Sequence, residues 1–273
     1  MDVFTDKIAL VTGGASGIGR ALCEQLGGHG TTVIVADINA GKAEAVAQGI
    51  TQRGGRAGSA VLDVSDTDAV RQFIDAMVAA YGRIDYLFNN AGIAIVGDMR
   101  NMTAADWERI LAVNLRGVVN GVAAAYPHMI SQRAGHIVNT ASMAGLVPMP
   151  ALVAYAMTKH AVIGLSTSLR IEAAPFGVRI SAVCPGFVHT GIVTAAHYLD
   201  APREAVTPVL KFLRPIEASD CARAVLRGVR RNRAIIVTPF AARLGWWFYD
   251  LFPQLWLRLA QWGMGRYRTL PGT

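Results

Sequence analysis

The chain has 273 residues, of which 52% are hydrophobic and only 16% are charged, a composition typical of a globular protein and not of a disordered one. The formal net charge is +7, but the excess is local: residues 203–273 hold 12 basic and four acidic residues, whereas residues 1–202 hold 14 and 15. Because the first three quarters of the chain have no basic excess, we expect no nucleic-acid partner.

Cysteine usage and the N-terminal segment indicate the compartment. Cys23, Cys184 and Cys221 are odd in number and widely spaced, which argues against a disulfide framework or a zinc site and favours reducing conditions. The first residues include acids and no long apolar run, so we expect no secretory signal. No run of about 18 apolar residues predicts a membrane span. We therefore expect a cytoplasmic protein without a bound metal.

Strand and helix signals alternate along most of the chain. Short apolar runs predict strands at residues 8–12, 32–36, 57–62, 85–88, 136–140, 178–183 and 234–238. Helical patterns lie at residues 17–26, 40–52, 65–81, 103–132, 152–174 and 218–231. Ser65-x-x-Asp68 and Thr103-x-x-Asp106 have the spacing of capping boxes that begin two of these helices.

This alternation predicts an α/β fold, a doubly wound, Rossmann-type parallel sheet of about seven strands with helices on both faces. We expect residues 1–240 to form a single dinucleotide-binding and catalytic domain, followed by a hydrophobic C-terminal extension at 241–273. Ligands of such sheets bind at the carboxyl ends of the strands. The functional residues are therefore expected in the loops that follow the strands.

A glycine-rich turn joins the first predicted strand to the first predicted helix. Residues 12–19 read Thr-Gly-Gly-Ala-Ser-Gly-Ile-Gly, and such a turn lets backbone amides approach a pyrophosphate at the positive end of a helix. The predicted cofactor contacts in this turn are Gly13, Ser16, Gly17, Ile18 and Gly19. Glycines in many such turns serve packing alone, so the turn needs support from other residues.

Asp37 supplies that support at the end of the second predicted strand, 18 residues after Gly19. A carboxylate here can accept hydrogen bonds from the adenosine ribose of NAD, and it repels the additional phosphate of NADP. No basic residue adjoins it, since Ile38 and Asn39 follow. An exposed loop acid is the alternative interpretation, but the sequence favours NAD over NADP.

Polar motifs follow the later strands in a fixed order. They are Asn89-Asn90-Ala91-Gly92, Asn114, Ser142, Tyr155-Ala156-Met157-Thr158-Lys159, and Pro185-Gly186 with Thr190. Together with the glycine spacing at 13, 17 and 19, this order resembles the shorter-chain branch of the short-chain dehydrogenase/reductase family over about residues 5–240. The resemblance implies an oxidoreductase that uses a nicotinamide cofactor on an alcohol or carbonyl group.

Tyr155 and Lys159 are four residues apart and share one face of a predicted helix. A free tyrosine has a pKa near 10, too high for efficient proton transfer at neutral pH. A cation about 4 Å away at an effective dielectric constant of about 20 contributes on the order of 4 kcal/mol, or about three pKa units. Because desolvation opposes this shift, the positive charge of an oxidised nicotinamide is expected to help. The pair therefore predicts a tyrosine whose pKa is lowered by its lysine.

The resemblance implies a role for each matched residue. Tyr155 would be the general acid/base, Lys159 would lower its pKa and bind the nicotinamide ribose, and Ser142 would hold the substrate oxygen. Asn114 would link Lys159 to a proton-relay water. The implied cofactor contacts beyond the glycine turn are Asp37, Asp63, Val64, Asn90, Ala91, Gly92, Pro185, Gly186, Val188 and Thr190, with Tyr155 and Lys159 themselves. Taken singly, Ser142 can also be a turn cap, Asn114 a buried amide and Thr190 a loop hydroxyl.

The segments expected to border the substrate are largely apolar. Residues 143–152 follow Ser142, and residues 187–215 form a long loop that the resemblance identifies as a substrate lid. An apolar wall selects an apolar body, so we expect a lipophilic secondary alcohol or ketone of steroid-like, terpenoid, retinoid-like or fatty type. Apolar residues here can equally pack against the fold.

Two other functions stay open. One is a 3-oxoacyl ketoreductase that acts on acyl groups carried by a protein; Asp37 disfavours it, because such reductive enzymes usually prefer NADPH. The other is a non-catalytic cofactor-binding protein of the same fold, which would be expected to lack part of the Ser142, Tyr155 and Lys159 group. By analogy with the family we expect a homodimer or homotetramer.

Residues 241–273 depart from the minimal pattern of the family. Four of the chain's five tryptophans lie here, and Pro253 divides the segment into two short predicted helices. Three interpretations are open: packing on the same or a partner subunit, lining of the substrate entrance, and peripheral contact with a membrane, for which tryptophan and arginine are suited.

Overall fold

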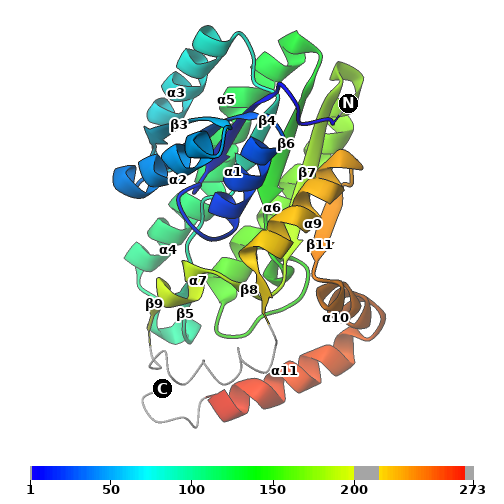
Figure 1. Cartoon of the computed structure of the whole chain (residues 1–273). Coiled ribbons are helices and arrows are strands. Elements are labelled where there is room, and N and C mark those ends of the chain that lie inside the picture. The colour runs from blue at the N-terminus through cyan, green and yellow to red at the C-terminus, as the bar shows by residue number, and fades with distance from the viewer. Residues whose placement is uncertain (1, 200–214, 268–273) are drawn as a thin grey trace.

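The structure is a computed structural model that describes residues 2–199 and 215–267. Within these residues the core is a seven-stranded sheet of order β11-β7-β6-β4-β1-β2-β3, whose neighbouring strands are all parallel (Figure 1). The strands are β1 (Ile8–Thr12), β2 (Thr32–Asp37), β3 (Arg56–Val61), β4 (Tyr86–Asn89), β6 (Gly135–Thr140), β7 (Val178–Pro185) and β11 (Ile235–Thr238). The predicted doubly wound fold is confirmed.

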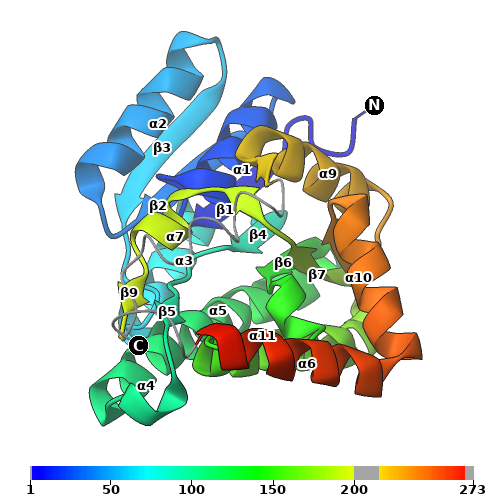
Figure 2. The same ribbon diagram turned by 90° about the horizontal axis from the view of Figure 1, so that it is seen from below.

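Helices cover both faces of this sheet (Figure 2). One face carries α1 (Gly17–Gly28), α2 (Ala40–Gln52) and α9 (Ala218–Arg230), and the other carries α3 (Thr67–Tyr81), α5 (Gly117–Gln132) and α6 (Val153–Ala173). The strand order reverses between β1 and β4. At such a switch point the loops leave the sheet in opposite directions, which opens a crevice at the carboxyl ends of the strands.

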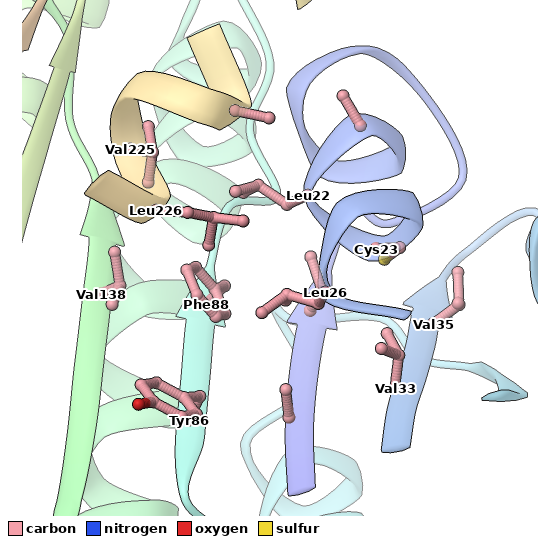
Figure 3. Packing of buried hydrophobic residues seen from close by; sticks show 14 of the residues in the cluster. Leu22, Cys23, Leu26, Val33, Val35, Tyr86, Phe88, Val138, Val225 and Leu226 are labelled. Atoms are coloured by element: carbon pink, nitrogen blue, oxygen red, sulfur yellow. The ribbon is translucent and has the colours of Figure 1, made fainter. Parts of the chain in front are cut away.

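Apolar side chains fill the space between sheet and helices. Figure 3 shows the face covered by α1 and α9, where Leu22 and Leu26 of α1 lie near Leu226 of α9 and Phe88 of β4. Leu26 and Phe88 have no exposed surface, and burial of each such side chain stabilises the fold by about 1.5–3 kcal/mol. The site is thus held by a rigid scaffold.

The start of α3 differs from the prediction. Ser65 and Asp68 do not form a capping box; Asp66 is the N-cap residue, and its carboxylate accepts a hydrogen bond from the amide of Ala69 at 3.0 Å. Ser65 is held by Asp63 through its amide and hydroxyl, at 2.9 and 2.7 Å. Aspartate is at least as good an N-cap as serine, so the nearer acid takes the position.

The helix predicted over residues 103–132 contains an irregular segment. It begins with the predicted capping box of Thr103 and Asp106 at α4 (Ala104–Leu111). Five π-helical residues, Ala112–Arg116, then precede α5. Such segments shift side chains out of α-helical register and occur frequently at functional sites. Here the shifted segment contains Asn114.

The predicted lid at 187–215 is only partly described, since residues 200–214 lie outside the described ranges. Its first part forms β8 (Val188–His189), the short helix α7 (Gly191–Thr194) and β9 (His197–Tyr198). β8 pairs with β10 (Ile216–Glu217) and β9 pairs with β5 (Ile95–Val96), both in parallel. The ends of the segment are therefore tied to the domain.

After β11 the chain forms α10 (Phe240–Leu251) and α11 (Pro253–Tyr267), in agreement with the break predicted at Pro253. Figure 1 shows both helices at the end of the molecule where the sheet strands end. Trp246 packs against the apolar cluster that contains α6. In the described parts of the chain, no helix combines the length and hydropathy needed to cross a bilayer.

Candidate active site

The glycine turn after β1 has a backbone that requires glycine. Gly13 and Gly17 have φ angles of +63° and +50°, values that L side chains adopt only with strain. An ideal Cβ on Gly19 would lie 2.1 Å from the carbonyl oxygen of Gly13. The third glycine is therefore explained by tight packing of α1 on the turn, and the first two by conformation.

The N-terminus of α1 offers a site for an anion. Ser16 is its N-cap residue, yet its side chain makes no capping hydrogen bond, and the first turn of the helix contains no acid. The amides of a first helical turn lack partners within the helix, and they attract phosphate groups. Thr190 faces this turn, because its Cβ would lie 3.1 Å from an ideal Cβ on Gly17. The structure thus brings two predicted cofactor residues from distant strands together.

Asp37 is joined to the same turn. Its Oδ2 accepts a hydrogen bond from the amide of Ala15 at 3.1 Å, and its Oδ1 accepts one from the amide of Asn39 at 3.0 Å. Asp37 is therefore not merely an exposed loop acid: it positions the glycine turn and places a negative charge at the carboxyl end of β2.

Thr12 connects the glycine turn to the loop after β4. Its hydroxyl oxygen accepts hydrogen bonds from the amides of Asn90 and Ala91, at 3.0 and 3.2 Å. The side chain of Asn90 in turn donates to the carbonyl oxygens of Thr12 and Gly13, at 3.2 and 3.3 Å. The motifs singled out in the sequence do not include Thr12, although a hydroxyl at the end of a buried strand indicates a nearby polar partner.

Other predicted cofactor residues lie at the same edge. Val64 is buried, and its side chain lies 2.7 Å from an ideal Cβ on Gly117, so this glycine lets α5 approach the loop after β3. Asp63 is exposed beside it. Gly186 donates its amide to the carbonyl oxygen of Thr238 at 2.7 Å, continuing the β7 to β11 ladder by one residue. Contacts of these residues with a cofactor stay predictions.

Ser142, in the loop after β6, comes together with Tyr155 and Lys159 of α6. The hydroxyl of Ser142 accepts a hydrogen bond from the amide of Ala144 at 3.1 Å, and it lies near enough to the phenol of Tyr155 to lower the pKa of that phenol. Ser142 is thus both a turn cap and a partner of the tyrosine. The Nζ atom of Lys159 lies 5.6 Å from the centroid of the Tyr155 ring and donates to the carbonyl oxygen of Thr140 at 2.9 Å.

Burial governs the protonation of this group and differs from the sequence-based expectation. Burial raises the pKa of Tyr155, while its hydrogen bond with Ser142 acts in the opposite direction. Burial also lowers the pKa of Lys159 to about 8. The pKa of the phenol is therefore raised and not lowered as expected, because desolvation outweighs the hydrogen-bonding effect of Ser142. The phenol is protonated at neutral pH, the form that can donate a proton.

Asn114 and Thr158 form a buried support under the tyrosine. Asn114 accepts from the amide of Ile93 at 2.8 Å and donates to the carbonyl oxygen of Ile93 at 3.0 Å. Its amide also donates to the hydroxyl of Thr158 at 3.4 Å, and this hydroxyl donates to the carbonyl oxygen of Tyr155 at 2.7 Å. Asn114 therefore fits the interpretation as a satisfied buried amide, and its link to a relay water stays a prediction.

The surroundings of Tyr155 are apolar. The ring lies in a cluster whose buried members are Ile95, Ile110 and Ala154. Half-buried members come from four segments and are Ile93, Met102, Trp107, Tyr155 and Leu199. Leu199 belongs to the described beginning of the predicted lid. Hydroxyl groups of Ser142 and Tyr155 therefore stand beside an otherwise apolar surface.

A glycine turn at the switch point of a parallel sheet, next to a half-buried phenol and a buried ammonium, suits a dinucleotide whose nicotinamide reaches these two groups. The uncapped first turn of α1 fits the pyrophosphate of such a cofactor, and the carboxylate of Asp37 fits its adenosine ribose. The class defined by fold and site is a nicotinamide-dependent oxidoreductase.

Comparison with known proteins identifies the family. Residues 7–198 match the family model described as short chain dehydrogenase, and the chain belongs to the short-chain dehydrogenase/reductase family. It is 38% identical to the 3-oxoacyl-[acyl-carrier-protein] reductase FabG of Thermotoga maritima, over 67% of this chain and 75% of that protein.

Solved structures agree with this assignment. A short-chain dehydrogenase/reductase from Burkholderia phymatum in complex with NAD has a TM-score of 0.85 and 31% identity, covering 93% of this chain and 96% of that one. A metagenomic short-chain oxidoreductase in complex with NADP has a TM-score of 0.72 and 31% identity, covering 86% and 98%. The protein is an NAD(P)-dependent oxidoreductase of this family.

Proposed function

We propose that the protein transfers a hydride between NAD(H) and the secondary alcohol or ketone group of a lipophilic compound. The observation that carries this proposal is the proximity of the Ser142 and Tyr155 hydroxyl groups, with Lys159 beside them, at the edge of an apolar cluster. Two hydroxyl groups can hold one substrate oxygen, while the apolar side chains contact the body of the substrate.

Tyr155, Ser142 and Lys159 have different roles in moving a proton to or from the substrate oxygen. A bound nicotinamide supplies the hydride in reduction and accepts it in oxidation. In reduction, the phenol of Tyr155 protonates the carbonyl oxygen, and Ser142 donates a hydrogen bond to the same oxygen. In oxidation, the Tyr155 phenolate takes the alcohol proton. The ammonium of Lys159, 5.6 Å from the ring centroid, stabilises this phenolate relative to the phenol.

A preference for NAD is part of the proposal. Asp37 supports it, because its carboxylate lies at the end of β2 and accepts from Ala15 in the glycine turn. A ribose with two free hydroxyls can donate to this carboxylate, whereas a ribose phosphate would meet its negative charge.

A second candidate is the reduction of 3-oxoacyl groups, which the 38% identity to FabG favours. The charge of Asp37 weighs against it, since the phosphate of NADPH would be repelled. A cofactor-binding protein without activity is disfavoured, because Ser142, Tyr155 and Lys159 are all present and close together.

Assembly and location complete the proposal. We propose a homodimer or homotetramer, and exposed apolar residues on α6, Val153, Met157 and Ile171, support a partner subunit. We also propose a cytoplasmic location. It is supported by the three cysteines, which are free buried thiols, as expected for a reducing compartment.

Replacement of the phenol tests the catalytic assignment. Tyr155→Phe should lower kcat by about 10²–10⁴-fold in either direction, because it removes only the proton donor and acceptor. NADH binding, followed by nicotinamide fluorescence, should be retained. Tyr126→Phe, a tyrosine on α5, is the matched control and should keep full activity. Substantial turnover by Tyr155→Phe with a panel of lipophilic alcohols would refute the assignment.

Removal of the Asp37 charge tests the cofactor preference. Asp37→Asn keeps an oxygen that can accept from Ala15, whereas Asp37→Ala does not. Both variants should weaken NADH binding about tenfold or more while leaving NADPH binding equal or stronger, since each loses the repulsion. Kd values from fluorescence titration decide the point. Equal losses for the two cofactors would show that Asp37 acts only on the turn.

A further inference from the structure

The C-terminal extension, residues 240–267, has apolar side chains on two sides of its helices. The half-buried side, here called the inner stripe, consists of Ala242, Trp246, Trp256, Ala260 and Met264. The exposed side, here called the outer stripe, consists of Phe240, Leu244, Trp247, Leu251, Phe252, Leu255, Leu259 and Trp262. Spacings of three and four residues place each set on one side of its helix.

The inner stripe explains how the extension is held. Trp246 packs against the core, and the rings of Phe248 and Tyr249 contact Trp256 at centroid distances of 6.3 and 6.0 Å. Trp256 also donates its Nε1 hydrogen to the carbonyl oxygen of Pro148, at 3.4 Å. Phe252 of the outer stripe also contacts Phe248, at a centroid distance of 5.7 Å, but the contacts with the domain are made by Trp246 and Trp256.

The outer stripe is unusual for a helix surface. A helix that packs through one side normally turns polar residues outward. Here the outward side carries four aromatic rings and four leucines, and Leu251 is 72% exposed. Contiguous exposed apolar side chains of this kind mark a surface that contacts something else.

The charge around the outer stripe indicates what that contact is. Residues 240–273 contain four arginines, one aspartate, and no lysine or glutamate. Arg258 is exposed on α11, and the guanidinium carbon of Arg266 lies 4.2 Å from the ring centroid of Trp262. Tryptophan beside arginine is typical of the headgroup region of membranes, and a net positive segment is attracted to anionic lipid.

We propose that the outer stripe docks on the surface of an anionic lipid bilayer, with α10 and α11 lying in its headgroup region. This attachment is peripheral, because no described helix is able to span a bilayer. The proposal concerns binding only. It does not depend on the proposed hydride transfer, and its test does not use activity.

Vesicle binding tests the proposal with the full chain. Vesicles of phosphatidylcholine with one quarter phosphatidylglycerol should bind the protein about tenfold more tightly in flotation assays than vesicles of phosphatidylcholine alone. Added salt should weaken the anionic binding, since it screens the arginines. Equal binding to both vesicles, or binding to neither, would overturn the proposal.

A matched pair of variants locates the surface. Leu251→Glu places a charge on the outer stripe and should weaken binding to the anionic vesicles about tenfold. Val61→Glu is the control, because Val61 is also apolar and is 64% exposed, but it lies on β3 at the edge of the sheet. It should bind like the unchanged protein. Equal losses in the two variants would contradict the assignment of the surface to α10 and α11.

Tryptophan fluorescence gives a second readout. Brominated lipids in the anionic vesicles should quench the protein, and the double change Trp247→Phe with Trp262→Phe should remove most of this quenching. Trp107→Phe, on α4, should not. If Leu251→Glu lowers the mass of the particle in solution and leaves vesicle binding unchanged, the outer stripe contacts a second copy of the chain, and the membrane proposal is wrong.

Discussion

The α/β domain and the C-terminal extension use apolar residues in opposite ways. In the domain, side chains such as Leu26, Phe88 and Ile137 have no exposed surface. In the extension, no residue of 240–266 is buried, although tryptophan, phenylalanine and leucine dominate its sequence. The apolar residues of the domain therefore pack into its own interior, whereas the outer stripe of the extension is exposed in the described chain.

The two regions also depend on packing to different degrees. The chemistry of the domain follows from residues fixed by close packing, such as Gly19 against Gly13. The role of the extension follows from the composition of an exposed surface. Changes that act through packing should therefore affect the domain strongly and the extension weakly.

The largest effect is expected at Gly19. In Gly19→Ala the new Cβ would lie 2.1 Å from the carbonyl oxygen of Gly13, so the turn or α1 must shift. We expect the free energy of unfolding to fall by about 3 kcal/mol, the upper part of the range for overpacking, and NADH binding to weaken with it. Urea unfolding and fluorescence titration measure both.

Gly28→Ala is the control within the same helix. No heavy atom lies within 4 Å of an ideal Cβ on Gly28, and it should leave NADH binding unchanged. If Gly19→Ala and Gly28→Ala had the same stability and the same affinity for NADH, the close approach of α1 to the glycine turn would not determine either property.

The sequence predicted those features that need particular residue types, and it did not predict those that depend on backbone atoms or on competing neighbours. The alternation of strand and helix patterns located the sheet. The order of Gly17, Tyr155 and Lys159 located the candidate active site at the edge of the sheet, because that site needs these residue types. The capping box at Ser65 was wrong, since two competing N-caps stand next to each other. The carbonyl oxygen of Thr140 that holds Lys159 could not be predicted, because every residue carries such an atom.

The pKa of Tyr155 is another property that could not be predicted from the sequence. The spacing of Tyr155 and Lys159 was correctly interpreted as one helix face, but the sequence does not give the depth of burial. In the structure, desolvation raises the phenol pKa and lowers that of Lys159. Likewise, the inner and outer stripes of the extension were not separable from sequence, because both are apolar.

Lowering the pH is expected to reduce the free energy of unfolding by an intermediate amount. His136 is buried in β6 and hydrogen-bonded to Ser181 at 2.8 Å, and burial lowers its pKa to about 3. An unfolded histidine has a pKa of about 6.5, so between these values the unfolded chain binds more protons. Stability is therefore full above about pH 6.5 and falls as the pH drops towards 3.

His136→Gln should remove this component. Between pH 6.5 and 4.5 the unchanged protein should lose about 2–3 kcal/mol more free energy of unfolding than the variant does, at about 1.4 kcal/mol per pH unit. Urea unfolding at the two pH values gives the difference. His160→Gln, an exposed histidine on α6, should keep the acid sensitivity of the unchanged protein. If His160→Gln lowered the acid sensitivity as much as His136→Gln does, the acid sensitivity would not come from the burial of His136 in the sheet.

The smallest effect is expected at Gly263 in α11. No heavy atom lies within 4 Å of an ideal Cβ on this glycine, so Gly263→Ala meets open space, unlike Gly19→Ala. Alanine should stabilise α11 by about 0.5–1 kcal/mol through helix propensity alone. Slower amide hydrogen exchange confined to α11, with an unchanged Tm for the domain, is the expected result. A large change in Tm would mean that the extension is as tightly packed as the domain, and the contrast between the two regions would fail.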